Sequence, residues 1–312
     1  MAETASTRVA YGQTLLELAR QNPDIVALDA DLSASTQTKL LAAEFPDRFF
    51  DCGIAEANMI GIASGLAASG KIPFASTFAV FMPGRCFDQI RVSIAYNGFN
   101  VKLVATHSGI SAGEDGATHQ GIEDLALISS LPGFTVIVPA DAAETVQTVK
   151  AAAATEGPFY IRLCRPNTPV VFDDSYKFEL GKAAVLRKGA DATIMAIGIM
   201  VDAARNAAEN LAKDGIDCRV LNMSTIKPID EAAIISAAKE TGAIVTAEDH
   251  REHGGLGDTV ARVLVKNQPV PMEFVAMKDV FAKSGKPAEL LERYGLSAEG
   301  IEKAVRTVIK KK

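Results

Sequence analysis

The chain has 312 residues, of which 48% are hydrophobic and 22% charged, and its formal net charge is −6. At roughly 150 residues per domain, this length predicts about two domains with buried cores, and the composition excludes a disordered, collagenous or disulfide-stapled protein. The negative charge argues against sequence-independent binding of nucleic acid, which requires a basic field to neutralise phosphates.

Cysteine usage and hydropathy bound the compartment. The cysteines are widely separated, with no Cys-x-x-Cys motif and no histidine at metal-ligand spacing: Cys52, Cys86, Cys164 and Cys218. We therefore expect reduced core thiols and no metal site on this chain. No apolar run reaches the roughly 18 residues of a membrane helix, and the polar start MAETASTR lacks the apolar segment of a signal peptide. The sequence predicts a cytoplasmic protein that does not span a membrane.

Short apolar runs alternate with longer stretches of helical period, a pattern typical of βα units around a parallel sheet. In the first half we expect strands at 25–30, 48–53, 72–77, 101–107, 134–139 and 158–164. Helices are expected at about 9–21, 37–44, 56–69, 84–96, 121–130 and 141–154. These elements predict one doubly wound α/β domain.

The segment RPNTPVVFDDSYKFELG, near 165–182, has neither period and is interpreted as a linker. Beyond it, strands are expected at 183–189, 192–198, 216–223, 243–249 and 273–277, with helices near 201–213, 230–240, from 257, and at the C-terminal end. We expect a second doubly wound α/β domain with a mainly parallel sheet, and set the boundaries at 1–170, a linker at 171–182, and 183–312.

The densest group of polar residues lies in VATHSGISAGEDGATHQG (104–121), which follows a predicted strand. Open α/β sheets bind ligands at the carboxyl ends of their strands, and His107 and His119 stand near the two ends of this loop with side chains that titrate near neutral pH. A flexible glycine-rich connection with solvated side chains is the alternative. Metal binding is not expected, because no third ligand follows at short spacing.

Glu56 is predicted in the first turn of an apolar helix, where the helix dipole favours a carboxylate. By itself this also suits an ordinary acid at a helix N-terminus. Phe78 and Phe81 follow the next strand and could point into one pocket, although paired aromatics are more often part of a core. The turn at 252–257 could hold an anion on helix amides, but a tight turn into the helix is the preferred interpretation.

Several motifs occur in order along the chain: GIAEANMIGIASGLAASG, STFAVF, VATHSGISAGEDGATHQGIEDLA, LPGFTVIVPAD, LCRPNTP and, later, TAEDHREHGGLGD. Together they resemble the C-terminal part of a transketolase, with residues 1–170 similar to the pyrimidine-binding domain. The family's Gly-Asp-Gly…Asn motif, which holds Mg²⁺ and the diphosphate, is absent. The chain therefore resembles the C-terminal subunit of a split transketolase.

This resemblance implies a transferase of carbohydrate metabolism and the pentose phosphate pathway, which moves a two-carbon ketol unit from a ketose phosphate to an aldose phosphate. It implies thiamine diphosphate as cofactor, with Mg²⁺ (or Ca²⁺) held by a separate diphosphate-binding N-terminal subunit, and two copies of each chain. A split enzyme specialised for a branched or sulfonated sugar would share these features.

On the cofactor side, Glu56 matches the family's catalytic glutamate, which hydrogen-bonds the pyrimidine and favours the imino form that deprotonates the thiazolium carbon. The aromatics that flank the pyrimidine match Phe78 and Phe81. Further cofactor contacts are implied for Asp31, Leu32 and Ile54.

On the substrate side, His107 and His119 match residues that bind substrate hydroxyls and shuttle protons, and both are implied to be catalytic. Asp115 matches a residue that holds a substrate hydroxyl of defined configuration. The sugar-phosphate clamp is matched by Arg8, Ser35 and Arg165, and arginine suits phosphate because its fork is planar and bidentate.

The sequence departs from the family pattern at Ala55, Ala57, Gly84 and Ser108. Three alternatives remain. Deoxyxylulose-phosphate synthase has a similar pyrimidine domain but typically lacks the Ala-Thr-His before the loop. The beta subunit of 2-oxo-acid dehydrogenases has a similar size, but the arginines and Thr-His-Gln disfavour it. A non-catalytic scaffold subunit would not need Glu56, His107, Asp115 and His119 together.

Overall fold

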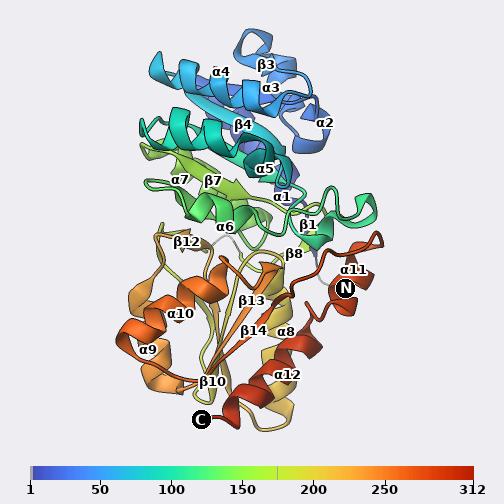
Figure 1. Cartoon of the computed structure of the whole chain (residues 1–312), viewed down its shortest axis with the longest axis vertical. Coiled ribbons are helices and arrows are strands. Elements are labelled where there is room, and N and C mark those ends of the chain that lie inside the picture. Colours follow the sequence, from blue (N-terminus) through green and yellow to red (C-terminus); the bar gives the residue numbers. More distant parts are fainter. Residues whose placement is uncertain (1–2, 174) are drawn as a thin grey trace.

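The computed structural model contains two mainly parallel sheets, which follow one another along the long axis of the molecule (Figure 1). The structure describes residues 3–173 and 175–312. We call the seven-stranded sheet with its helices the first unit, and the five-stranded sheet with its helices the second unit. The predicted fold class, doubly wound α/β with mainly parallel sheets, is confirmed.

The first sheet has the strand order β12-β6-β7-β5-β4-β2-β3. Its strands are β2 (Ile25–Asp29), β3 (Phe49–Asp51), β4 (Ile72–Phe78), β5 (Lys102–Thr106), β6 (Thr135–Ile137), β7 (Phe159–Arg162) and β12 (Thr225–Lys227). Neighbouring strands are parallel except β12, which runs antiparallel to β6. All of these except β12 were predicted, because each is a short apolar run.

Helices surround this sheet: α1 (Thr7–Gln21), α2 (Ser33–Thr36), α3 (Lys39–Glu44), α4 (Glu56–Ala68), α5 (Phe81–Gln89), α6 (Asp124–Ser129) and α7 (Ala142–Ala154). Shorter helical turns occupy Pro46–Arg48, Ile90–Ala95 and Ile110–Asp115. The single helix predicted at 84–96 is wrong in detail: it begins three residues earlier, at Phe81, and changes to π-helical turns after Gln89.

The side chains of β2 show how the sheet is buried on both faces. Val26 and Leu28 pack in one cluster with Met59 of α4 and Met82 of α5. Ile25 and Ala27 belong to a second cluster, with Tyr11 and Leu15 of α1 and Val149 and Ala152 of α7. Because successive strand residues point to opposite faces, a continuous apolar strand has a core on each side.

The second sheet has the order β14-β13-β10-β11-β9. Its strands are β9 (Ala184–Arg187), β10 (Ala192–Ala196), β11 (Cys218–Asn222), β13 (Ile244–Arg251) and β14 (Met272–Met277). Only β9 is antiparallel to its neighbour. The helices are α8 (Met200–Lys213), α9 (Glu231–Thr241), α10 (Leu256–Asn267), α11 (Pro287–Arg293) and α12 (Ala298–Ile309). The prediction missed α11.

Segments of the chain cross between the two units. β12 comes from the sequence of the second unit but extends the first sheet, and Lys227 on it donates to the carbonyl of Ser129, Nζ to O 3.0 Å. The predicted linker is not wholly irregular, because β8 (Thr168–Pro169) pairs with β1 (Thr4–Ala5). Asp141, the N-cap of α7, then accepts the amides of Val171 and Phe172. The units are therefore joined by strand pairing as well as by the connecting chain.

Two findings on composition complete the fold. The four cysteines are free; Cys86, Cys164 and Cys218 are buried as predicted, whereas Cys52, also predicted as a core thiol, is only half-buried. No helix in the described part of the chain is both long and apolar enough to cross a bilayer.

Candidate active site

The site begins where β4 and β5 end side by side. Phe78 and Thr106 are register partners at the carboxyl ends of these parallel strands. His107 directly follows Thr106, so Phe78 and His107 emerge at the same edge of the sheet. Their rings stack with centroids 3.9 Å apart. His107 has a positive φ of 55°, an uncommon conformation for a residue with a side chain. It turns the chain into the histidine loop, which we define as residues 107–121.

Two further rings complete an aromatic cluster of Phe78, Phe81, His107 and His119. The ring centroids of Phe78 and Phe81 are 5.8 Å apart, so the two phenylalanines do meet, as the sequence suggested. His119 meets Phe81 edge-on, with centroids 5.3 Å apart, and Phe78 at 6.4 Å. The structure thus brings together both ends of the histidine loop and both aromatics.

Glu56 lies beside this cluster as the first residue of α4, and it is only 4% exposed. Its Oε1 accepts a hydrogen bond from Nη1 of Arg85 at 2.5 Å. The same guanidinium lies over the ring of Phe81, 3.8 Å from its centroid. Arg85 therefore links the carboxylate to the aromatic cluster, at a distance and geometry typical of a cation–π contact.

Sequence reasoning missed Arg85. The available signal was its position four residues after Phe81, which places both side chains on one face of α5. The glycine before it, Gly84, stands where the family has an aromatic, and a Cβ there would meet no atom within 4 Å. The departure at Gly84 thus leaves open space, while Arg85 covers Phe81.

His107 is 5% exposed. Burial lowers its pKa to about 3, and the positive charges of Arg8 and Arg165 and the neighbouring His119 act in the same direction. Its Nδ1 lies 2.9 Å from the hydroxyl oxygen of Thr106. The imidazole is consequently neutral at physiological pH, and can offer one nitrogen as donor and the other as acceptor.

A basic group lies next to the cluster. Arg8 donates to the carbonyl of Ser35 at 2.7 Å and to that of Arg165 at 3.0 Å, and its buried Nε has no hydrogen-bond partner. Nη1 of Arg165 is 3.2 Å from a carboxylate oxygen of Glu114 and 3.4 Å from one of Asp115. The three residues matched to the phosphate clamp, and Asp115, are therefore neighbours.

Asp31, Leu32 and Ile54 occupy the ends of β2 and β3 instead. The amide of Asp31 donates to Oδ1 of Asp51 at 3.1 Å, and that of Leu32 to Oδ1 of Asp29 at 2.5 Å. Asp31 has a positive φ and an exposed side chain, and Ile54 is 77% exposed. Asp31 and Ile54 are therefore exposed at the surface of this chain, and Leu32 is half-buried.

At the turn 252–257, the first two helix amides already have a partner. Glu248 of β13 accepts the amides of Leu256 and Gly257 at 2.8 and 2.9 Å, and burial raises its pKa to about 7. A carboxylate of the protein itself therefore occupies the start of α10, which supports a tight turn rather than an anion site.

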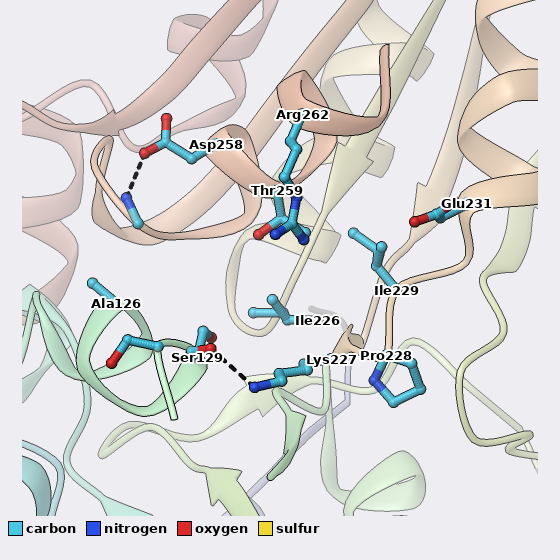
Figure 2. A pocket seen from close by; sticks show the side chains of 12 residues that line it. Ala126, Ser129, Ile226, Lys227, Pro228, Ile229, Glu231, Asp258, Thr259 and Arg262 are labelled. Carbon is cyan, nitrogen blue, oxygen red and sulfur yellow. Dashed lines mark hydrogen bonds between the residues drawn. The ribbon is translucent and has the colours of Figure 1, made fainter. Parts of the chain in front are cut away.

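A pocket of about 530 Å³ lies elsewhere, between the units around β12 (Figure 2). Residues of α6, β12 and α10 line it, including Ser129, Lys227 and Arg262. None of the residues predicted for the site is among them. Cavity size alone would therefore select a different region of the molecule from the one that the sequence predicts.

The sequence matches two families along its length. Residues 3–171 match the transketolase pyrimidine-binding domain, and residues 181–301 match the transketolase C-terminal domain. The chain belongs to the transketolase family. The order of the two matches agrees with the order of the motifs.

Among similar proteins, a putative transketolase C-terminal section of Methanocaldococcus jannaschii is 46% identical over 307 residues, covering 97% of this chain and 96% of that protein. A 6-deoxy-6-sulfo-D-fructose transketolase subunit of Clostridium sp. is 45% identical, covering 98% of this chain and 95% of that one. A solved structure of a split gene transketolase, described as an inactive β4 tetramer, superposes with a TM-score of 0.92 at 50% identity, covering 99% of this chain and all of that one. The chain thus corresponds to the C-terminal subunit of a split transketolase.

The residues present fit one end of the transketolase cofactor. Glu56 is a buried carboxylate that Arg85 joins to the ring of Phe81, and a carboxylate and an aromatic ring suit the pyrimidine of thiamine diphosphate, which needs both a hydrogen-bond partner and an aromatic platform. Within residues 3–173 and 175–312, no group of three or more His, Cys, Asp or Glu side chains could hold a metal ion.

Proposed function

We propose that this transketolase subunit transfers a two-carbon ketol unit from a ketose phosphate to an aldose phosphate, in the cytoplasm, as part of a pentose-phosphate type of metabolism. The observation that carries the proposal is Glu56, which is buried at the start of α4 and joined through Arg85 to the Phe81 ring. The match to the transketolase pyrimidine-binding domain supports a role for this glutamate with thiamine diphosphate.

Glu56 binds the pyrimidine nitrogen and keeps the cofactor in its reactive tautomer, and Phe78 and Phe81 form the wall on which the pyrimidine rests. When bound, thiamine diphosphate supplies the nucleophilic carbon that carries the ketol unit. Arg85 contacts both Glu56 and Phe81, so it must leave or share this position when the pyrimidine binds. Asp31, Leu32 and Ile54 contribute to a cofactor site completed by another polypeptide.

His107 and His119 hold substrate hydroxyls and move protons to and from them. A neutral imidazole suits this role, because it can both donate and accept, and burial keeps His107 neutral. Asp115 positions a hydroxyl, while Arg8, Ser35 and Arg165 bind the phosphate. The Nε donor of Arg8 is buried and has no hydrogen-bond partner within residues 3–173 and 175–312.

The active enzyme is a heteromer. This chain lacks a metal-ligand cluster among its described residues, so a diphosphate-binding N-terminal subunit supplies Mg²⁺ (or Ca²⁺) and the diphosphate contacts, with two copies of each chain. The structure at 50% identity is described as an inactive tetramer of β chains, which supports the need for a second kind of subunit.

A specialised sugar is the second candidate. The relative at 45% identity is a 6-deoxy-6-sulfo-D-fructose transketolase subunit. A sulfonate, like a phosphate, is an oxyanion that arginine forks can bind. A substrate panel with the reconstituted pair, comparing ketose phosphates, sulfonated ketoses and branched ketoses, would separate these possibilities by kcat/KM.

The proposal is tested by Glu56→Ala in the reconstituted enzyme. We expect a loss of at least about 10²-fold in kcat, the usual scale for acid–base groups, with the variant still folded. Glu44→Ala is the control, because Glu44 is an exposed acid that is paired to Arg20. A near-wild-type rate for Glu56→Ala would remove Glu56 from its role.

A further inference from the structure

We propose that Asp249, a residue of the second unit, is a positioning residue that holds the histidine loop in its substrate-binding geometry. The inference rests on the proposed function of that loop and gives the C-terminal domain a task in the reaction. Asp249 lies near the end of β13, and its side chain belongs to the interface between the two units.

The carboxylate of Asp249 reaches across this interface to the loop backbone. Oδ1 accepts the amide of Ile110 at 3.0 Å, and Oδ2 lies 3.4 Å from the amide of Ser111. These are the first two residues of the 3-10 helix Ile110–Asp115, so their amides have no partner within the helix. Asp249 itself is 3% exposed, and a buried carboxylate that accepts two amides fixes the start of this helix.

A chain of contacts continues from this point to His107. The hydroxyl of Ser111 donates to the carbonyl of Ser108 at 2.9 Å, and Ser108 directly follows His107. Gly109 donates its amide to the carbonyl of Gly121 at 2.8 Å, which closes the loop at its base. Asp249 is therefore connected to the imidazole through Ser111 and Ser108.

The loop is built to accept this carboxylate. A Cβ at Gly109 would lie 2.0 Å from Oδ2 of Asp249, and Gly109 also has a positive φ of 66°. Only glycine allows both the conformation and the close approach. The second unit touches the loop again where Gln120 donates to the carbonyl of Lys283 at 3.2 Å.

Asp249 uses different atoms to join the units and to hold the loop. Its backbone carbonyl accepts Nη2 of Arg162 at 2.9 Å, and Arg162 is itself bound to Asp124. Only the carboxylate of Asp249 contacts the loop amides. A substitution of the side chain therefore changes the loop while the backbone connection remains.

The test compares Asp249→Asn with Glu248→Gln in the full chain combined with its N-terminal subunit. Glu248 is the preceding residue, is also buried, and also accepts two backbone amides, but they are those of Leu256 and Gly257 in α10. Both substitutions keep the shape and remove the charge. The measurements are kcat/KM for the sugar substrates, thiamine diphosphate affinity by calorimetry, thermal stability, and hydrogen exchange of the Ile110 and Ser111 amides.

For Asp249→Asn we expect a fall in kcat/KM of about 10- to 100-fold, unchanged cofactor affinity, and faster exchange of the two loop amides. For Glu248→Gln we expect a comparable change in stability with kcat/KM and loop exchange as in wild type. Equal catalytic losses in the two variants, or an Asp249→Asn enzyme with normal kcat/KM, would overturn the proposal.

If Asp249→Asn does not fold, Ser111→Ala decides, because it removes only the bond to Ser108. A fall in kcat/KM with unchanged cofactor affinity supports the positioning role, and an unchanged kcat/KM overturns it. Failure of the proposed function is distinguishable: the wild-type pair would then transfer no ketol unit, whereas the exchange measurement on the loop would still report whether Asp249 holds it.

Discussion

The two sides of the site depend on different parts of the molecule. Glu56, Phe78, Phe81 and Arg85 belong to α4, β4 and α5, and their contacts are made within the first unit. The histidine loop starts from the same sheet, but its amides and Gln120 are bonded to residues of the second unit. The cofactor side is therefore supported locally, and the substrate side is supported across the interface.

We therefore expect substrate handling and cofactor binding to respond differently to mutations in the two units. Substitutions at the interface should alter substrate handling and leave the pyrimidine contacts in place. Substitutions around Glu56 should do the reverse. The predictions below test whether the two sides separate in this way.

The largest effect is expected at Arg162, which bonds to Asp124 of the first unit and to the backbone of Asp249 in the second. Arg162 and Asp124 form a buried pair, with the guanidinium 3% and the carboxylate 1% exposed and Nε to Oδ2 at 2.8 Å. Arg162→Met leaves the carboxylate buried without its partner, and we expect a loss of about 3–5 kcal/mol in the free energy of unfolding. Urea denaturation measures it.

The control for that variant is Arg187→Met, which breaks a more exposed pair with Asp217, N to O 2.9 Å. It should cost about 1 kcal/mol or less. A loss at Arg162 no larger than at Arg187 would show that the interface is not held by this pair, and that the second unit is free to detach from the loop.

An intermediate effect is expected at Arg165, one of the residues proposed to bind the sugar phosphate. Arg165→Lys keeps the positive charge and loses the planar fork, so KM for phosphorylated sugars should rise about tenfold, equivalent to one charge-assisted hydrogen bond. Steady-state kinetics with a phosphorylated substrate and its unphosphorylated counterpart measure it.

Arg187→Lys is the matched control, since that arginine is also paired to a carboxylate but lies in the second sheet. An equal rise in KM for both kinds of sugar in the Arg165 variant would mean that the guanidinium acts on the loop and not on the phosphate.

A further effect concerns acid stability. The folded-state pKa of His107 is about 3, below its ordinary value near 6.5, so between these pH values the unfolded chain binds a proton that the folded chain does not. Stability is therefore lost as pH falls from about 6.5 towards 3. His107→Gln should reduce this loss. Unfolding curves across this pH range measure the slopes, and identical slopes would contradict the buried, neutral state.

Local patterns predicted the elements that carry the cofactor side. The apolar runs at β2, β4 and β5 and the acid at the start of α4 can each be recognised within a few neighbouring residues. Phe78 and Phe81 could be paired for the same reason, because they follow one strand. The sequence did not predict Arg85 as the partner of Glu56, because their bond spans 29 residues of sequence.

The substrate side could not be completed in this way. β12 is three residues long and belongs to the sheet of the other unit, so its own sequence does not report its partner. Asp249 is 139 residues from Ile110, and no periodicity relates them. Its motif, TAEDHREHGGLGD, was recognised as part of a family pattern, but the contact with the loop required the three-dimensional arrangement.

The central claim is that this chain provides one half of a transketolase active site and needs an N-terminal subunit for the other. The most direct measurement is the rate of ketol transfer by this chain alone, by the N-terminal subunit alone, and by their mixture, each with thiamine diphosphate and Mg²⁺. We predict activity only in the mixture, rising until the two chains are equimolar. Ketol transfer by this chain alone would contradict the account.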